Sequence, residues 1–333
     1  MDKIDIVYLW VDGADKKWLA EKNKWQTKIT GKKPSAIKSD IERYRDNDEL
    51  KYSLRSLSEC APWINHIYII TGFNQIPKWL KKSNKKITIV PHEKIFPKGA
   101  LPTFNSSSIE MCIDKIENLS EHFLLTNDDM FFNKPLKPSF FYTKRGQPYI
   151  RHVTRHINPR KVGFYLDNIS EYRSKLVLSA RTIEQIYNRK LYKYAPSHGI
   201  DAYLKSSWIE CRNHPLIKPT IDKQIFNKFR TKTELQRWIF NLYNIVHKRG
   251  KLCRVRPHKS GHNKFFDTIY NAIFWFKTGR STYACPNVIG HEKSLQRAAI
   301  FCINDSESNT PEILTANKQF LQNRFPNKSE FEK

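Results

Sequence analysis

The 333-residue sequence has no apolar run that approaches the ~20 residues needed to span a bilayer. Its N-terminus, Met1–Asp5, also lacks the basic, apolar and small-residue regions of a secretory signal. These absences favour a cytoplasmic protein over a secreted or membrane-spanning one. The length suits one large or two ordinary domains with a substantial core.

The sequence has no CxxC pair, although it contains six cysteines. Their scattered positions predict reduced thiols rather than a disulfide framework. A zinc site made of Cys211, His214, Cys253 and His258 is an alternative, but this spacing fits the known zinc motifs poorly.

Acidic residues are scarce, because 32 Asp and Glu stand against 58 Lys and Arg, which gives a net charge of +26. This balance favours polyanionic partners: nucleic acid, an anionic membrane surface or phosphorylated substrates. The chain carries no RNA-recognition core motif, zinc-finger spacing or basic heptad region, so we expect no specific nucleic-acid partner. Peripheral contact with anionic lipid fits the charge equally well.

The sequence also lacks a P-loop and a GxGxxG motif. It nevertheless begins with an apolar strand, residues 4–11, that ends in the turn Asp12-Gly13, as is typical of a nucleotide-binding α/β domain. Further strands are predicted at residues 66–72, 87–92 and 124–132, and helices at residues 46–61 and 106–119. This order predicts a largely parallel sheet with right-handed crossovers.

Helix starts are predicted at two places by residues that cap helices. Asp46 or Asn47 is expected to cap the helix that contains Leu50, Leu54 and Leu57, and Thr233 is expected to cap a later one. After Pro138 the alternation of strands and helices fades, which predicts a more helical C-terminal half. The aromatic-rich residues 265–276 predict a core helix or a membrane-facing surface.

The stretch Leu124–Phe132 places Asn127, Asp128 and Asp129 between apolar residues. Charge at the end of a buried strand is unfavourable unless a cation or a partner compensates it. Ligands of open α/β sheets bind outside the carboxyl ends of the strands, so a metal-assisted nucleotide site is one interpretation. A turn in which Asn127 and Asp128 cap the next segment explains the same residues equally well.

Four blocks of the sequence extend this interpretation. They are residues 6–13 (IVYLWVDG), residues 45–132 with the motifs RDNDEL, LPTF and NDDMF, the pair PSH at 196–198 with FR at 229–230, and CIND at 302–305 with FP at 325–326 and EF at 330–331. Together they resemble the stealth family of hexose-1-phosphate transferases, which includes bacterial capsule-polymer phosphotransferases and the catalytic region of the lysosomal-enzyme GlcNAc-1-phosphotransferase. Two features depart from the family pattern: Ser197 separates Pro196 from His198, and no His follows Asp305.

The resemblance implies a Rossmann-like, GT-A-like α/β fold with a largely parallel sheet flanked by helices. It implies one catalytic module over residues 1–333. Residues 1–140 would bind the nucleotide sugar, residues 141–300 would form a mainly helical acceptor or lid part, and residues 301–333 would return to the site.

The resemblance also implies a reaction. Hexose-1-phosphate or N-acetylhexosamine-1-phosphate would pass from a UDP-hexose or UDP-N-acetylhexosamine to a hydroxyl of a growing glycan, with release of UMP and with Mg²⁺ or Mn²⁺ as cofactor. The acceptor would be a lipid-linked glycan of a surface polysaccharide, at the inner face of the plasma membrane. The alternatives are a glycosyltransferase that releases UDP, a basic nucleic-acid-binding protein and an inactive scaffold.

On the matched blocks, Asp129, Asp128, Arg45, Arg230 and His198 are the catalytic candidates, and Asp129 is favoured as the general base. Asp128, Asp129 and Asp305 are candidate ligands, because hard cations prefer carboxylates. Arg45 and Arg230 could clamp phosphate bidentately, although pairing of Arg45 and Arg55 with nearby acids explains the same pattern. The candidate donor-binding residues are Trp10, Val11, Asp12, Gly13, Asn47, Asp48, Arg55, Thr103, Asn105, Ser106 and Asn127.

Overall fold

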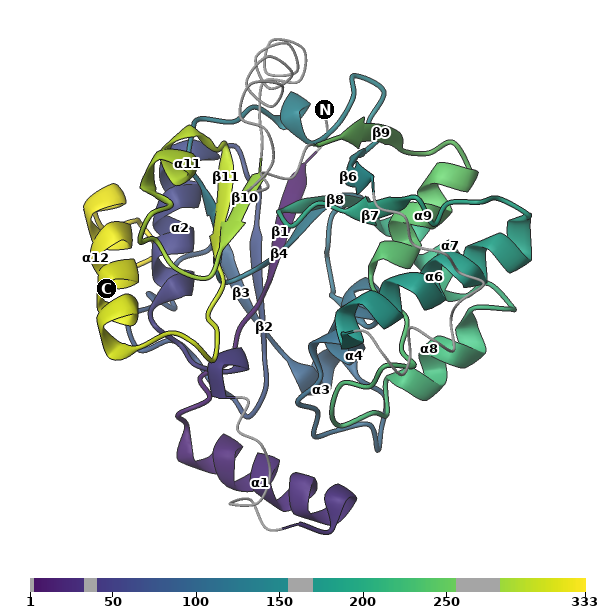
Figure 1. Cartoon of the computed structure of the whole chain (residues 1–333), viewed down its shortest axis with the longest axis horizontal. Coiled ribbons are helices and arrows are strands. Elements are labelled where there is room, and N and C mark those ends of the chain that lie inside the picture. The colour runs from purple at the N-terminus through teal and green to yellow at the C-terminus, as the bar shows by residue number, and fades with distance from the viewer. Residues whose placement is uncertain (1–2, 33–40, 155–169, 256–281) are drawn as a thin grey trace.

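The computed structural model describes residues 3–32, 41–154, 170–255 and 282–333. At its centre lies a five-stranded sheet in the order β3-β2-β1-β4-β8 (Figure 1). Its strands are β1 (Ile4–Leu9), β2 (Ile67–Thr71), β3 (Ile87–Pro91), β4 (His122–Asn127) and β8 (Asp201–Leu204). The first four strands are parallel and β8 runs antiparallel to β4, so the predicted largely parallel α/β sheet is confirmed.

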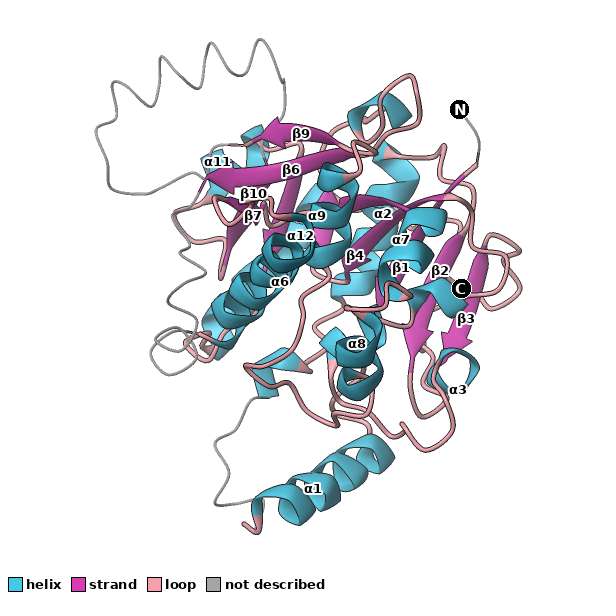
Figure 2. Cartoon of the chain, turned by 90° about the vertical axis from the view of Figure 1, so that its right-hand side faces the viewer, coloured by secondary structure: helices cyan, strands magenta, loops and turns pink. Residues whose placement is uncertain are grey.

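Helices flank this sheet on both sides (Figure 1). They are α1 (Lys16–Thr30), α2 (Glu49–Cys60), α3 (His92–Ile95), α4 (Ser106–Glu110), α6 (Glu171–Tyr187), α7 (Lys205–Arg212), α8 (Lys218–Gln224), α9 (Trp238–Val246), α11 (Glu292–Arg297) and α12 (Pro311–Arg324). Helix α1 projects from the body of the molecule in both views (Figures 1 and 2). The cluster α6–α9 gives the C-terminal half its predicted helical character.

The central strands are apolar throughout because both faces of the sheet are buried. Val7 and Leu125 point into a core shared with α6–α9, whereas their neighbours Ile6 and Leu124 point into a second core shared with α2. Because successive side chains of a strand point to opposite faces of the sheet, each strand contributes to both cores. The predicted leucine face of α2 fills the second core.

Two smaller sheets lie in the described part of the chain. One has the order β10-β11-β5, with β10 (Thr282–Cys285), β11 (Ile300–Ile303) and β5 (Met130–Phe132). The other has the order β7-β6-β9, with β6 (Tyr149–Thr154), β7 (Tyr194–Pro196) and β9 (Lys251–Arg254). Since only Asp128 and Asp129 separate β4 from β5, the pairing of β5 with β11 carries residues 304–305 to the end of β4.

Three local predictions are wrong. Helix α2 begins at Glu49 after Asp48, which has a φ of 69° and makes no side-chain cap, so neither Asp46 nor Asn47 caps it. The helix predicted over 106–119 ends at Glu110 and is followed by a separate turn of 3-10 helix. Helix α9 begins only at Trp238, too far along the chain for Thr233 to cap it.

The described cysteines are free thiols, as predicted. His258 of the alternative zinc set and the segment 265–276 lie outside the described residues. In the part of the chain that the structure describes, no helix is long and apolar enough to cross a membrane. The expected domain boundaries at 140 and 300 stay a prediction. β8 pairs with β4 across the first of them.

Candidate active site

A cavity of about 640 Å³ opens at the carboxyl ends of β1 and β4. β1 pairs with β2 on one side and with β4 on the other, so the strand order reverses at β1. The segments that follow β1 and β4 therefore lead away from each other, and ligands of open α/β sheets bind at such a point. The cavity lining includes the following predicted residues: Trp10, Val11, Arg45, Thr103, Ser106, Asn127, Asp128, Asp129, His198, Arg230 and Asp305. The structure therefore brings together residues that lie up to 295 positions apart in the sequence (305 − 10).

One wall of the cavity is crowded with carboxyl groups. The pKa of Asp128 is raised by desolvation and then by the negative charges of Asp129, Glu49 and Asp46. Burial raises the pKa of Glu49 to about 7 and that of Asp46 to about 6. Carboxyls that raise one another's pKa in this way form a site that a cation stabilises.

The Asp129 carboxylate contacts a thiol and an imidazole. Cys302 donates from Sγ to Asp129 Oδ2 at 3.3 Å, and the same sulfur lies 3.4 Å from His198 Nε2. Desolvation raises the pKa of Asp129, whereas the nearby His198 lowers it. Desolvation also lowers the pKa of His198, even though part of its ring is open to the cavity. Asp129 can therefore accept a proton more readily than an ordinary carboxylate does.

Arg45 also lines the cavity. Its Nη1 is 3.5 Å from Asp305 Oδ2, while Asp305 Oδ1 accepts hydrogen bonds from Ser306 N and the Asn309 side chain. Arg45 is thus paired with an acid, but the expected pairing with its sequence neighbours is wrong, because Asp305 lies just after β11.

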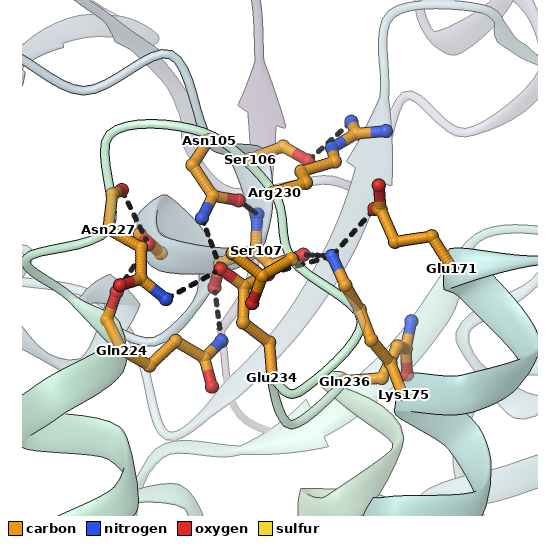
Figure 3. Close-up of polar contacts among 12 residues, drawn as sticks. Asn105, Ser106, Ser107, Glu171, Lys175, Gln224, Asn227, Arg230, Glu234 and Gln236 are labelled. Carbon is orange, nitrogen blue, oxygen red and sulfur yellow. Dashed lines mark hydrogen bonds and ion pairs between the residues drawn. The ribbon is translucent and has the colours of Figure 1, made fainter. Parts of the chain in front are cut away.

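Arg230 enters the cavity from a second wall, built by α4, α6 and the loop before α9 (Figure 3). Arg230 Nη2 donates to Ser106 Oγ at 2.6 Å, and Ser106 is the first residue of α4. Asn105 caps α4 by accepting from Ser107 N at 3.0 Å, and its amide donates to Glu234 Oε1 at 2.7 Å. These bonds fix the Arg230 loop to the helix that the sequence predicted as a phosphate or sugar subsite.

Lys175 is a buried residue of this wall. Its Nζ contacts Glu234 Oε2 at 2.8 Å, Glu171 Oε1 at 2.9 Å and Ser107 Oγ at 2.9 Å (Figure 3). Nearby, Arg237 bonds Glu110 at 2.9 Å and approaches Asp201 at 3.4 Å. Sequence reasoning missed these cavity residues, because a single lysine or arginine within a helical pattern carries no local signal.

Several predicted donor-binding residues lie outside the lining. Arg55 binds the Glu332 carboxylate through two nitrogens, at 2.7 and 2.8 Å, and donates to the Phe325 carbonyl at 2.9 Å. Asp48 pairs with Lys318 at 2.9 Å, and Asn47 donates to Glu49. Each of these polar groups therefore already has a partner within the fold, and of these partners Glu49 itself lines the cavity.

Asp12, Gly13 and Asn105 also lie behind the cavity surface rather than on it. Asp12 Oδ1 accepts from Ala14 N at 2.9 Å and so shapes the turn after β1. Gly13 N donates to Tyr44 O at 2.8 Å, and a Cβ at position 13 would stand 2.4 Å from that oxygen. Gly13 thus allows the segment ending in Arg45 to approach β1 closely.

The metal role of Asp128, Asp129 and Asp305 stays a prediction, although the three do not form one compact ligand group. One group of three possible metal ligands occurs among the described residues: Asp129, His198 and Cys302. Their ligand atoms all lie within 4.8 Å of one another. Asp128 lies outside this group, and Asp305 is held instead by Arg45, Ser306 and Asn309.

Comparisons with known proteins place the chain in a family. The models of stealth protein conserved region 1 and conserved region 2 match residues 2–29 and 43–150. The exopolysaccharide phosphotransferase cps2G of Lactiplantibacillus plantarum is 28% identical over 99% of this chain and 96% of its own length. The capsular polysaccharide phosphotransferase fcs1 of Haemophilus influenzae is 30% identical over 92% of this chain and 79% of its own length.

Among solved structures, the galactosyltransferase LgtC, crystallised with donor and acceptor sugar analogues, aligns over 98% of this chain and 96% of its own. The TM-score is 0.46 at 10% identity. The sequence relatives are much closer, and their similarity runs through both the acidic turn after β4 and the segment that carries Arg45. The chain therefore belongs to the stealth family, and like its polysaccharide phosphotransferase relatives it is a transferase enzyme.

Proposed function

We propose that this enzyme transfers a hexose-1-phosphate or N-acetylhexosamine-1-phosphate from a UDP-sugar to a hydroxyl of a growing glycan. UMP leaves, and a phosphodiester joins the sugar to the acceptor in a surface polysaccharide. The observation that carries the proposal is one cavity that holds the Asp128–Asp129 pair together with Arg45 and Arg230. Its volume of about 640 Å³ falls in the ordinary range for small-molecule sites.

The reaction assigns a task to each of these side chains. The acceptor hydroxyl attacks the phosphorus next to the sugar, the bond from that phosphorus to the UMP oxygen breaks, and the sugar C1–O bond stays intact. Asp129 takes the hydroxyl proton, and its raised pKa suits this role. Arg230, anchored by Ser106, and Arg45 hold the charge that grows on the phosphate oxygens.

Mg²⁺ or Mn²⁺ fits the acidic wall, because the pKa of Asp128 is raised by three neighbouring carboxyls that a divalent cation would relieve. Asp128 would hold the ion and leave Asp129 free to act as the base, and Asp305 would remain with Arg45. When bound, such an ion neutralises phosphate charge and makes UMP a better leaving group.

The acceptor side of the proposal is a lipid-linked glycan at an anionic membrane surface. Helix α1 packs through Trp18 against Tyr44 and Phe104, beside the cavity. Its exposed lysines are Lys16, Lys17, Lys24 and Lys28. Each lysine close to anionic lipid contributes about 1 kcal/mol of attraction, so this helix could hold the cavity near the acceptor.

The nucleotide product tests the reaction. The purified enzyme would be incubated with a panel of UDP-hexoses and UDP-N-acetylhexosamines, Mg²⁺ or Mn²⁺ and glycan acceptors, and UMP would be separated from UDP. We expect UMP that depends on acceptor and metal, and that is lost in Asp128→Asn. Asp222→Asn, on the surface of α8, is the matched control and should keep the activity. UDP as the product would mean that the sugar C1–O bond breaks, and would overturn the proposal.

A further inference from the structure

Asp129, His198 and Cys302 bring three different ligand atoms to one point. The sulfur of Cys302 lies 3.3 Å from Asp129 Oδ2 and 3.4 Å from His198 Nε2, and all three ligand atoms lie within 4.8 Å of one another. In a tetrahedral zinc site with Zn–S of ~2.3 Å and Zn–N of ~2.0 Å, such atoms stand about 3.5 Å apart. The thiol thus already stands at zinc-site spacing from both partners.

The chemistry of this donor set differs from that of the Asp128–Asp129 pair. Thiolate and imidazole are softer ligands that bind Zn²⁺ or Co²⁺, whereas Mg²⁺ demands an octahedron of oxygen atoms. Cys302 is fully buried behind the cavity, while Asp129 and His198 line it. A metal held by the three would therefore keep an open position toward the cavity, as catalytic rather than structural zinc sites do.

The surroundings favour a cation at this point. Asp129 Oδ1 is buried and, within the described residues, accepts no hydrogen bond. Asp128 is the next residue, and Glu49 and Asp46 add negative charge beside it. The opposing cation, Arg237, is already paired with Glu110 and Asp201.

We propose that Asp129, His198 and Cys302 form a binding site for Zn²⁺ or a similar borderline metal, distinct from the Mg²⁺ or Mn²⁺ position of the proposed reaction. Binding replaces the proton of the Cys302 thiol by the metal and releases that proton to solvent. Because the bound metal takes the Asp129 carboxylate, it also removes the base from the proposed transfer. Zn²⁺ bound at this site would therefore inhibit the proposed transfer.

Cobalt tests the site directly, because Co²⁺ takes the same ligands and is coloured. The full-length, metal-free, reduced protein would be titrated with Co²⁺ and followed by absorption. We expect one equivalent to give the intense visible bands of a tetrahedral ion and a near-ultraviolet thiolate-to-cobalt charge-transfer band. Zn²⁺ should abolish both, and a 1,000-fold excess of Mg²⁺ should not.

Variants assign the ligands. Cys302→Ser should lose the charge-transfer band, and the matched variant Cys253→Ser, at the half-buried thiol of β9, should keep it. His198→Gln changes a partly exposed side chain, so it should fold normally and bind Co²⁺ at least ~10-fold more weakly.

No charge-transfer band in the folded wild-type protein, or a band that survives Cys302→Ser, would overturn the zinc site. Neither result bears on the proposed reaction, whose readout is UMP formed with Mg²⁺. Conversely, a cobalt site in a protein that releases UDP would leave the zinc inference standing and the proposed reaction overturned.

Discussion

The Lys175 ammonium and the Glu234 carboxylate form an ion pair of 2.8 Å in which both side chains are almost completely buried, at 2% and 1% exposure. The pair joins α6 to the loop that carries Arg230, and Glu234 in turn holds Asn105 at the start of α4 (Figure 3). Lys175 itself lines the cavity, and it positions the loop of Arg230 and the start of α4 through Glu234.

Replacing Lys175 by Met should lower the free energy of unfolding by about 3–5 kcal/mol, because Glu234 would be left buried without its cation. Urea titration measures the change. Lys24→Met is the matched control, since Lys24 pairs with Glu21 on the surface and is worth at most about 1 kcal/mol. The double variant Lys175→Met/Glu234→Gln should recover part of the loss. Equal stability of Lys175→Met and Lys24→Met would contradict this account.

Gly13 controls where Arg45 stands. In Gly13→Ala the new methyl would lie 2.4 Å from the Tyr44 carbonyl oxygen and 2.7 Å from its Cβ, so the segment must move. We expect a loss of about 1–3 kcal/mol in stability and, because Arg45 follows Tyr44, a fall in kcat/KM of up to about 100-fold. Steady-state UMP release and thermal unfolding measure the two effects. Ala14→Ser, at the exposed next position, should change neither, and wild-type kinetics in Gly13→Ala would rule out this role.

Much of the central sheet could be predicted because its strands are buried on both faces and read as continuous apolar runs. The turn at Asp128 and Asp129 stood out for the same reason, since charge is rare at the end of such a strand. The cap at α2 could not be predicted, because three acidic or amide residues in a row compete for it and the positive φ of Asp48 decides the outcome.

The partners across the cavity were beyond sequence reasoning. Arg230 meets Ser106 across 124 positions and Cys302 meets Asp129 across 173, and only the packing of α4, β5 and β11 sets these contacts. Asp305 was read as a metal ligand from its place after a strand. The register of β11 against β5 instead brings it to Arg45.

Arg55 was predicted to bind the donor, but in the structure it forms an ion pair with Glu332 away from the cavity lining. Its bidentate bond to Glu332 is buried, at 10% and 3% exposure, so Arg55→Met should cost about 3–5 kcal/mol of stability while the folded protein keeps its affinity for the UDP-sugar donor. Lys318→Met is the matched control, because Lys318 ties Asp48 to α12 through an exposed contact worth at most about 1 kcal/mol. Denaturation and equilibrium donor binding would be measured on both variants. Weaker donor binding by folded Arg55→Met would restore the role expected from the sequence.

His92 should make the protein less stable in mild acid. It is buried, and desolvation lowers its pKa from 6.5 to about 4. Above pH 6.5 the ring is neutral in both states; between pH 6.5 and 4 the unfolded chain binds a proton that the folded chain does not. Stability therefore falls as pH drops through this window, by about 2 kcal/mol between pH 7 and pH 5 from this group alone.

The measurement for His92 is the urea unfolding free energy at pH 7 and pH 5, in wild type and in a variant without this histidine. Carboxyls that titrate in the same range are present in both proteins, so their contribution cancels in the comparison. His92→Gln should reduce the difference between the two pH values by about 2 kcal/mol relative to wild type. Burial also lowers the pKa of His152 to about 4. The double variant His92→Gln/His152→Gln should therefore show a still smaller difference in unfolding free energy between pH 7 and pH 5. If His92→Gln keeps the full wild-type difference, the acid sensitivity comes from other groups and His92 is protonated in the fold as readily as in the unfolded chain.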